Sequence, residues 1–362
     1  GAYLAGKLHL GGREHDLTVG VSSTRTTSKS DAFASMSNWR HDIANVHTWD
    51  GTAPKPAVSK TGARNDTLVQ QTGLYASARW RLTEPLSLLT GARVTRWTSK
   101  QKNYDTRGAL SGVSARQEVK HKVSPYLGVV YDITPSLAAY ASHTRIFNPQ
   151  NHRDVNNVPL KPAVGSNSEV GLKMALAHEL DLNLAIFETK QDNFAVVNAD
   201  AAPNSLPDGS TPYRTVDGTK GKGFDVELIG KVQPDWNLKA ALTRAKVTRQ
   251  ESDRLWANFP TWQLQLGSDY RFSGELRPLQ LGGFLTWQSK LEAYNVPSPS
   301  GRVYVTEKSK PLLDLYASWD FTEAYRLTLA VTNALDKKYW ANLDYANYGQ
   351  PRFFSATFRM AF

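Results

Sequence analysis

By residue type, the histidines of this sequence are the side chains best suited to bind a metal ion or to transfer protons. None of them forms the His-Glu-x-x-His arrangement of a zinc protease, and His41 and His47 stand six residues apart in a long polar segment. The chain has no cysteine, which excludes a thiol nucleophile, a Cys-ligated zinc site and an iron–sulfur cluster. The sequence therefore predicts no metal site.

The sequence also contains no recognisable set of residues for catalysing hydrolysis. No Gly-x-Ser-x-Gly elbow marks a serine nucleophile, and no pair of carboxylates stands out for glycoside or peptide hydrolysis. The segment Gly-Thr-Lys-Gly-Lys-Gly at 218–223 lacks the spacing of a phosphate-binding loop, so we interpret it as a flexible strand entry. We predict that the protein is not an enzyme and that it uses no cofactor.

The composition excludes two further classes of protein. Lys and Arg (43) exceed Asp and Glu (33), which gives a net charge of +10 over 362 residues. The basic residues are scattered, with no Lys/Arg-rich run of the kind that binds nucleic acid, so we predict no nucleic-acid partner. No stretch approaches about eighteen uncharged apolar residues, so we expect no transmembrane helix.

The elements that carry these residues show a period of two, which is typical of strands with one apolar and one polar face. From Leu313 to Phe321, apolar residues alternate with Asp314, Tyr316, Ser318 and Asp320. We expect Leu264, Leu266, Leu315, Leu329, Phe358 and Met360 to share one face, and Gln265, Asp314, Thr328 and Arg359 the other. About fifteen strands are predicted, near 1–10, 15–28, 65–82, 86–101, 116–132, 137–147, 165–176, 180–196, 213–232, 236–251, 258–272, 278–292, 303–319, 325–335 and 350–362.

The connections between these strands alternate in length. Turns of a few residues alternate with long segments such as 29–64, and aromatic residues including Trp80, Trp236 and Trp319 lie beside the short turns. Long alternating strands, short turns on one side and long loops on the other are typical of an outer-membrane β-barrel with interfacial aromatic girdles. A β-sandwich or propeller is the alternative, but sandwich strands are shorter and no blade repeat is present. We therefore predict an all-β, antiparallel transmembrane β-barrel.

Four segments resemble the TonB-dependent ferric-siderophore receptors. Within them, His143 and Ala163 depart from the Tyr and Glu usual in the family. The apolar alternation of the last strand also resembles the signal that the barrel-assembly machinery reads, and its residues here are Phe358, Met360 and Phe362. The four segments are Tyr140–Gln150 (Y-A-S-H-T-R-I-F-N-P-Q), Leu160–Lys173 (L-K-P-A…E-V-G-L-K), Leu329–Trp340 (L-A-V-T-N-A-L-D-K-K-Y-W) and Tyr348–Phe353 (Y-G-Q-P-R-F).

The resemblance implies a receptor in the bacterial outer membrane that binds a ferric siderophore at its extracellular side and imports it with energy supplied through TonB. Members of the family carry a TonB box and a plug within a barrel of about 22 strands. We therefore expect residues 1–362 to be the C-terminal part of such a barrel, without the plug and the first strands. Implied partners are the TonB complex, outer-membrane lipid, lipopolysaccharide and the barrel-assembly machinery. A passive porin is the alternative.

A ferric siderophore brings its own iron ligands, so the receptor must supply aromatic faces and hydrogen-bond donors. Arg96, Arg145, Arg244 and Lys290 are expected on the upper wall, where they would attract an anionic complex. The predicted siderophore contacts in the long segments are Trp39, Arg40, His41, Trp49, Tyr104, Phe147, Trp256, Tyr294 and Tyr345, and the same segments also contain Phe259, Tyr304 and Tyr348.

Deleting Phe362 should lower the yield of assembled barrel, because it removes the last aromatic residue of the predicted assembly signal, while siderophore affinity per assembled receptor stays unchanged. The yield is measured as the heat-modifiable band of outer-membrane fractions on gels. Replacing Phe362 by Tyr, which keeps the ring, is the control. An unchanged yield from the truncated chain would show that Phe362 carries no assembly signal.

Overall fold

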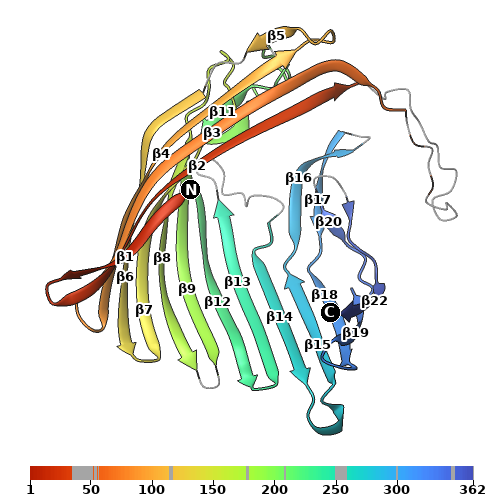
Figure 1. The fold of residues 1–362 in the computed structure, drawn as a ribbon. Helices are drawn as coiled ribbons and strands as arrows, with labels where there is room; N and C mark the ends of the chain where they lie inside the picture. The colour runs from red at the N-terminus through yellow and green to blue at the C-terminus, as the bar shows by residue number, and fades with distance from the viewer. Residues whose placement is uncertain are drawn as a thin grey trace.

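The computed structural model describes residues 1–34, 52, 55, 57–113, 117–176, 179–207, 209–248, 259–298, 301–343 and 347–361. It contains one large antiparallel sheet that curves as a continuous wall (Figure 1). Fifteen strands follow one another along this wall, from β1 at one edge to β22 at the other, and β5 pairs with β4 beside this path. In this part of the chain the helical content is a three-residue 3-10 turn, η1 (Gly274–Leu276), and no helix is long and apolar enough to cross a bilayer.

Most strands of the wall are long enough to cross a bilayer at a tilt, which takes about 9–11 residues. In wall order they are β1 (Ala2–Leu10), β2 (Arg13–Phe33), β3 (Lys60–Arg81), β4 (Leu86–Tyr104), β6 (Gln117–Thr134), β7 (Leu137–Asn148), β8 (Ala163–Leu176), β9 (Leu180–Asp192), β12 (Thr219–Gln233), β13 (Trp236–Thr248), β14 (Trp262–Arg271), β15 (Leu279–Gln288), β18 (Lys310–Asp320), β19 (Tyr325–Thr332) and β22 (Phe353–Met360). The shorter strands are β5 (Leu110–Val113), β10 (Phe194–Val197), β11 (Tyr213–Val216), β16 (Leu291–Ser298), β17 (Gly301–Glu307), β20 (Trp340–Asn342) and β21 (Asn347–Tyr348).

Each of the fifteen predicted segments overlaps one strand of the wall, so the predicted architecture is confirmed. The prediction of single strands over 180–196, 213–232, 278–292 and 303–319 was wrong, because each divides into a wall strand and a piece of a separate hairpin. Between β9 and β10, Asn193 takes a φ of 57°, and Gly218 between β11 and β12 takes a φ of 70°. The Asp192 and Asp217 carboxylates accept the Gly218 and Asn193 backbone N–H groups, which fixes this break.

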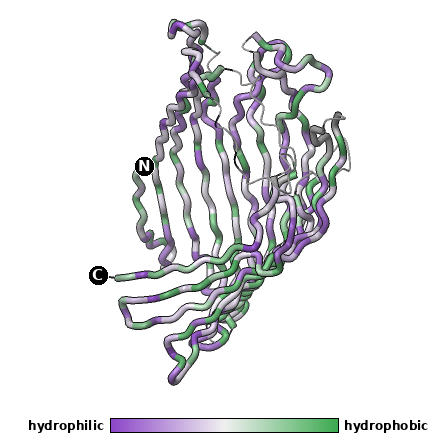
Figure 2. The backbone as a smooth tube through the Cα atoms, turned by 90° about the vertical axis from the view of Figure 1, so that its right-hand side faces the viewer, coloured by the Kyte–Doolittle hydropathy of each residue, from purple (hydrophilic) through white to green (hydrophobic). Residues whose placement is uncertain are grey.

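The register places one apolar row on a single face of the whole wall. Leu184 pairs with Leu172 and with Val226, and on the far side Leu329 pairs with Ala317 and Ala356. Side chains of this row are exposed, for example Leu74 (59%), Ile186 (64%) and Phe354 (72%). Figure 2 shows the hydrophobic and hydrophilic positions alternating along the strands. A row of exposed leucine and phenylalanine side chains of this extent is the surface that lipid covers.

The predicted sidedness of individual residues agrees with this register. Leu315 pairs with Gly283 and Val331, Leu329 with Ala317, and Phe358 with Leu327, all on the apolar face. Thr328 pairs with Ser318 on the opposite face, where the two hydroxyl groups are 2.8 Å apart. The same register puts Leu264, Leu266 and Met360 with the apolar set and Gln265, Asp314 and Arg359 with the polar set.

On the polar face, which is the inner face of the wall, large rings lie over glycines of the neighbouring strand. A Cβ on Gly282 would overlap the Tyr316 ring, because the two residues are direct cross-strand partners. The concave side of a curved sheet leaves less room per side chain, and glycine opposite an aromatic residue relieves the crowding. The same overlap would occur at Gly20 with Tyr75, Gly91 with Tyr126, Gly171 with Tyr140, Gly223 with Phe187 and Gly267 with Phe284.

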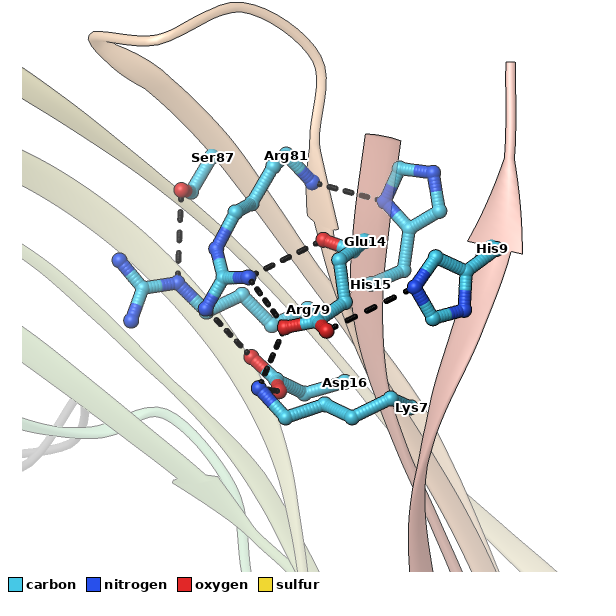
Figure 3. A network of polar contacts seen from close by, with 8 residues as sticks. All are labelled: Lys7, His9, Glu14, His15, Asp16, Arg79, Arg81 and Ser87. Carbon is cyan, nitrogen blue, oxygen red and sulfur yellow. Dashed lines mark hydrogen bonds and ion pairs between the residues drawn. The ribbon is translucent and has the colours of Figure 1, made fainter. Parts of the chain in front are cut away.

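Ion pairs join the inner faces of β1, β2 and β3 near the short turns (Figure 3). The Lys7 ammonium lies 2.8 Å from a Glu14 oxygen and 2.9 Å from an Asp16 oxygen, and Arg81 reaches the other Asp16 oxygen at 3.1 Å. His15, between Glu14 and Asp16 in β2, points to the opposite face of the wall and is buried. Its Nδ1 accepts the Arg81 backbone N–H at 3.0 Å. The network therefore aligns three strands at the point where the chain reverses direction.

Replacing Leu315 by Arg should lower the free energy of unfolding by about 2–4 kcal/mol, because the charge would enter hydrocarbon near the middle of the membrane. Leu315 is 43% exposed on the apolar face. The measurement is reversible denaturant unfolding of the barrel in lipid vesicles.

The matched control is Asp314→Asn on the opposite face. Asp314 accepts the Asn333 backbone N–H at 2.8 Å, and an asparagine oxygen can still accept this bond, so the change should be mild. Equal losses in the two variants would contradict the assignment of the two faces.

Candidate functional site

The short hairpins and long connections gather at one end of the wall, opposite the short turns (Figure 1). We call this the loop end; it carries β5 and the hairpins β10–β11, β16–β17 and β20–β21. In outer-membrane barrels, the longer loops are extracellular and the short turns periplasmic. The loop end is therefore the candidate site at which a ligand arrives from outside the cell.

Two connections far apart in the sequence pack together there into one unit, the 150/210 module, formed by residues 149–162 and 194–218. The His152 ring stacks on the Tyr213 ring, with centroids 3.9 Å apart and planes 25° from parallel. The Arg153 guanidinium donates hydrogen bonds to the Asn157 side-chain oxygen at 2.7 Å and to the Ser210 hydroxyl at 3.2 Å. The module therefore presents a preformed surface.

The 150/210 module is also bonded to Asn193, the residue that follows β9. The Gln150 amide donates to the Asn193 carbonyl oxygen at 2.9 Å and to the Lys161 carbonyl oxygen. Pro212 is fully buried, and Leu206 is 5% exposed. Between the two connections, the Tyr213 backbone N–H donates to the Arg153 carbonyl oxygen at 2.7 Å.

A second packed unit lies at the base of the hairpin β16–β17. Leu291, Ala293 and Leu343 form a buried cluster, with Val305 and Trp340 against it. On the hairpin, hydrogen bonds from Lys290 and Tyr304 hold the pKa of Glu292 below its usual range. Two of the residues expected near a ligand, Lys290 and Tyr304, are thus both bound to this carboxylate.

The C-terminal segments that resemble the receptor family meet in space. Asn333, buried and with a φ of 50°, donates from its side-chain amide to the Lys337 and Gln350 carbonyl oxygens at 2.9 and 3.0 Å. Gly349 lies against the Tyr339 ring, where a Cβ would overlap ring atoms. The packing of this connection therefore requires Asn at position 333, in Leu329–Trp340, and Gly at position 349, in Tyr348–Phe353.

The other two segments of the resemblance meet at Tyr140. Its hydroxyl donates to a Glu169 oxygen at 2.6 Å, its ring covers Gly171, and the Lys173 ammonium lies 5.5 Å from the ring centroid. The alternating residues Glu169, Gly171 and Lys173 thus surround one inward-facing ring. His143, where the family usually has Tyr, is 2.9 Å from the Ser168 hydroxyl.

The predicted ligand contacts are only partly within the described residues. Tyr104 and Phe147 lie at the loop ends of β4 and β7, and by register both belong to the outward face. The Arg64 guanidinium lies 4.3 Å from the centroid of the Tyr104 ring. Tyr294 lies in β16, where the backbone is described. Trp39, Arg40, His41, Trp49, Trp256 and Tyr345 lie outside the described residues, and so does Phe362 of the predicted assembly signal.

The sequence did not establish whether the cations expected on the upper wall face the lumen or the outside of the barrel. Arg96, Arg145 and Arg244 lie on the outward face, in register with the apolar row. Arg96 forms an ion pair with Glu118 at 2.7 Å, and the Arg244 guanidinium lies 5.5 Å from the centroid of the Trp262 ring. These three cations therefore face the surroundings of the barrel and not its lumen.

Sequence reasoning did not find the 150/210 module. Its two connections contain the turn residues Asn157, Asn204 and Gly209, all with positive φ, which signal turns but not which turns pack together. Among the described residues, no group of three or more His, Asp or Glu side chains could hold a metal ion.

The family model described as "TonB dependent receptor-like, beta-barrel" matches residues 2–334. The chain therefore belongs to the TonB-dependent receptor β-barrel family, whose members are receptors and transporters of the bacterial outer membrane. This confirms the family to which the four segments pointed.

Two similar relatives are named as receptors for ferric pyoverdine. The chain is 33% identical to the ferric-pyoverdine 358 receptor of Pseudomonas putida over 100% of its own length and 43% of that receptor. It is 32% identical to the ferripyoverdine receptor of Pseudomonas aeruginosa, over 97% of the chain and 42% of the relative. The chain thus spans less than half the length of these curated relatives.

Solved structures agree with these relatives. The pyoverdine outer-membrane receptor FpvA of Pseudomonas aeruginosa, bound to pyoverdine, superposes with a TM-score of 0.85 at 29% identity, covering 99% of this chain and 52% of FpvA. The alcaligin receptor FauA of Bordetella pertussis superposes with a TM-score of 0.68 at 28% identity, covering 91% of this chain and 50% of FauA.

Replacing Gly349 by Ala should lower the free energy of local unfolding of the connection between β19 and β22 by about 1–3 kcal/mol. The reason is that the added methyl group overlaps the Tyr339 ring. The measurement is the rate of proteolytic cleavage within 333–349 in the folded barrel, which should rise. Tyr339→Ala in the same chain should restore part of the protection by removing the ring. Gly6→Ala, where the added Cβ meets no atom within 4 Å, is the control. Unchanged cleavage in the Gly349 variant would refute this account of the Tyr-Gly-x-Pro-Arg segment.

Proposed function

We propose that the complete protein binds a ferric siderophore at its extracellular side and imports it across the outer membrane with energy supplied through TonB. The observation that carries this proposal is the match of the whole chain to ferric-pyoverdine receptors, at 33% identity over 100% of its length. A pyoverdine-like or hydroxamate siderophore is the first ligand to test, in keeping with the segments Tyr140–Gln150 and Leu160–Lys173. The plug that would couple the barrel to TonB is part of this proposal.

The loop end fits such a ligand in its chemistry. A ferric siderophore is a bulky chelate whose metal is already coordinated, so it is recognised through ring stacking and hydrogen bonds. The 150/210 module offers a stacked pair of rings, and the predicted contacts in 29–64 would supply Trp39, Arg40, His41 and Trp49. A passive porin has less support, because the family of the chain is that of TonB-dependent receptors.

Further partners follow from the location in the outer membrane. The apolar row would contact outer-membrane lipid and lipopolysaccharide, and the barrel-assembly machinery would insert the protein through the last strand. Phe358 is 56% exposed on the apolar face of β22, and Met360 is 45% exposed beside it. An outward aromatic pattern at the end of the chain supports the proposed assembly signal.

The test is growth of a receptor-null strain under iron limitation, carrying the complete gene and supplied with a panel of ferric siderophores. One class should restore growth, and a strain without TonB should not grow. Trp39→Ala or Trp49→Ala should weaken binding of that siderophore by about 1–3 kcal/mol if the ring lines the pocket. Trp236→Phe, at the short-turn end, is the matched control and should bind normally. Rescue by no siderophore, together with TonB-independent entry of small sugars, would support a porin instead.

A further inference from the structure

The two edge strands of the wall run in the same direction. β1 ends at the short turn before β2, and β22 ends beside the short turn between β18 and β19, where the Ala361 backbone N–H donates to the Ala324 carbonyl oxygen at 2.9 Å. Direct pairing of β1 with β22 would therefore be parallel, whereas the wall is antiparallel throughout. Because hydrocarbon cannot pair the open edge of β22, a closed antiparallel barrel needs beside it a strand that runs the opposite way.

Such a strand would begin at the short-turn end, where β22 finishes. We call the part of the complete chain that leads into this strand the entry segment. Neighbouring strands lie about 5 Å apart, so the entry segment would arrive next to the last residues of β22. The last residue of β22 on the inner face is Arg359, which pairs with Arg326 of β19. The charges around Arg359 therefore determine which side chains the entry segment can bring there.

A hollow of about 540 Å³ lies on the inner face at this end of the wall, and we call it the arginine hollow. It lies against the ends of β14, β18, β19 and β22 and the short connections between them. Its four guanidinium groups face only two carboxylates, which leaves a formal excess of two positive charges. The arginine hollow is thus complementary to an anion. Its charged residues are Arg271, Arg277, Arg326, Arg359, Asp320 and Glu323.

The ion pairs within the arginine hollow do not balance its charge. The Asp320 carboxylate is shared, because it accepts hydrogen bonds from Arg271 at 2.8 Å and from Arg326 at 2.9 Å. In the part of the chain that the structure describes, the guanidinium groups of Arg277 and Arg359 have no hydrogen-bond or ion-pair partner. Like charges directly opposite each other destabilise a sheet, as for Arg326 and Arg359. A carboxylate between these two guanidinium groups would remove the repulsion.

We propose that the entry segment carries Asp or Glu side chains that bind Arg277, Arg326 and Arg359 in the arginine hollow. These contacts fasten the seam, which is the pairing of β22 with the strand that closes the barrel. A turn fixes the register of a hairpin, but no turn joins the two strands of the seam, so side-chain contacts have to set its register. The proposal rests on the proposed function only in requiring the complete, closed barrel.

The experiment uses the complete receptor with Arg359→Lys, purified in detergent and treated with a water-soluble carbodiimide. The reagent joins an amine to a carboxylate in contact with it, with loss of water, and mass spectrometry of the digest identifies the joined residues. The introduced amine should be joined to an Asp or Glu of the entry segment. The native Lys7–Glu14 pair, 2.8 Å apart, should be joined in the same sample, which shows that the reagent acts. Ser355→Lys, on the same face of β22 but about 13 Å farther from the short-turn end, is the matched control and should give no such link.

A second measurement is the rate at which an added protease cleaves the entry segment. Arg326→Gln/Arg359→Gln should raise this rate at least about fivefold, because the ion pairs that hold the segment are lost, while Asp320 keeps its bond from Arg271. The control Arg13→Gln/Arg107→Gln removes the same charge from exposed residues at two turns and should leave the rate unchanged. Each variant is first checked for the heat-modifiable barrel, and Arg359→Gln alone replaces the double variant if that variant does not assemble.

Two outcomes would overturn the proposal. One is that the amine at position 359 is joined only to carboxylates of the wall, such as Asp320 or Glu323, or to none, while Lys7 and Glu14 are joined. The other is equal cleavage of the entry segment in the arginine variant and in its control. Failure of the receptor to transport any siderophore would count against the proposed function alone, because both measurements need only the assembled barrel.

Discussion

Hydrocarbon offers no hydrogen-bond partner to a peptide group, so each backbone N–H and C=O in a spanning segment must be paired within the protein. Within the described residues, the strands from β1 to β22 pair antiparallel with their neighbours across fifteen strands, and the register shifts locally at bulges, as between Thr95 and Trp97. Pairing in a sheet forces alternate side chains to opposite faces, which is why the period of two extends over the whole chain. Where the wall ends, this requirement is relaxed, and the pairing becomes local, in the hairpins β10–β11, β16–β17 and β20–β21.

The two faces of the wall meet different physical demands. On the inner face, space is limited, and aromatic rings such as Tyr316 lie over glycines such as Gly282. On the outer face, side chains are not crowded by the curvature of the sheet, but their environment changes along the membrane normal. Ile186 is therefore followed by Glu188 and Lys190 where hydrocarbon is replaced by head groups. Packing therefore governs residue choice inside the barrel, whereas solvation governs it outside.

The segments that resemble the receptor family have structural roles in this chain. Asn333 and Gly349 close the connection between β19 and β22, and Glu169, Gly171 and Lys173 surround the ring of Tyr140. Such residues define how the wall and its connections are built, which explains why they indicate the family. Choice of siderophore would depend on the loops, whose sequences can change without disturbing the wall.

The sequence by itself determined the strands, their two faces and the end at which the loops gather, because alternation and turn length are local properties of the chain. It did not determine that Asn193 and Gly218 interrupt two expected strands, since those breaks depend on carboxylates that bind across the base of a hairpin. Only the tertiary structure brought His152 onto Tyr213 and Tyr140 onto Glu169. It also decided that Arg145 and Arg244 face outward, because the side of a charged residue near a loop depends on the register of the strand beneath it.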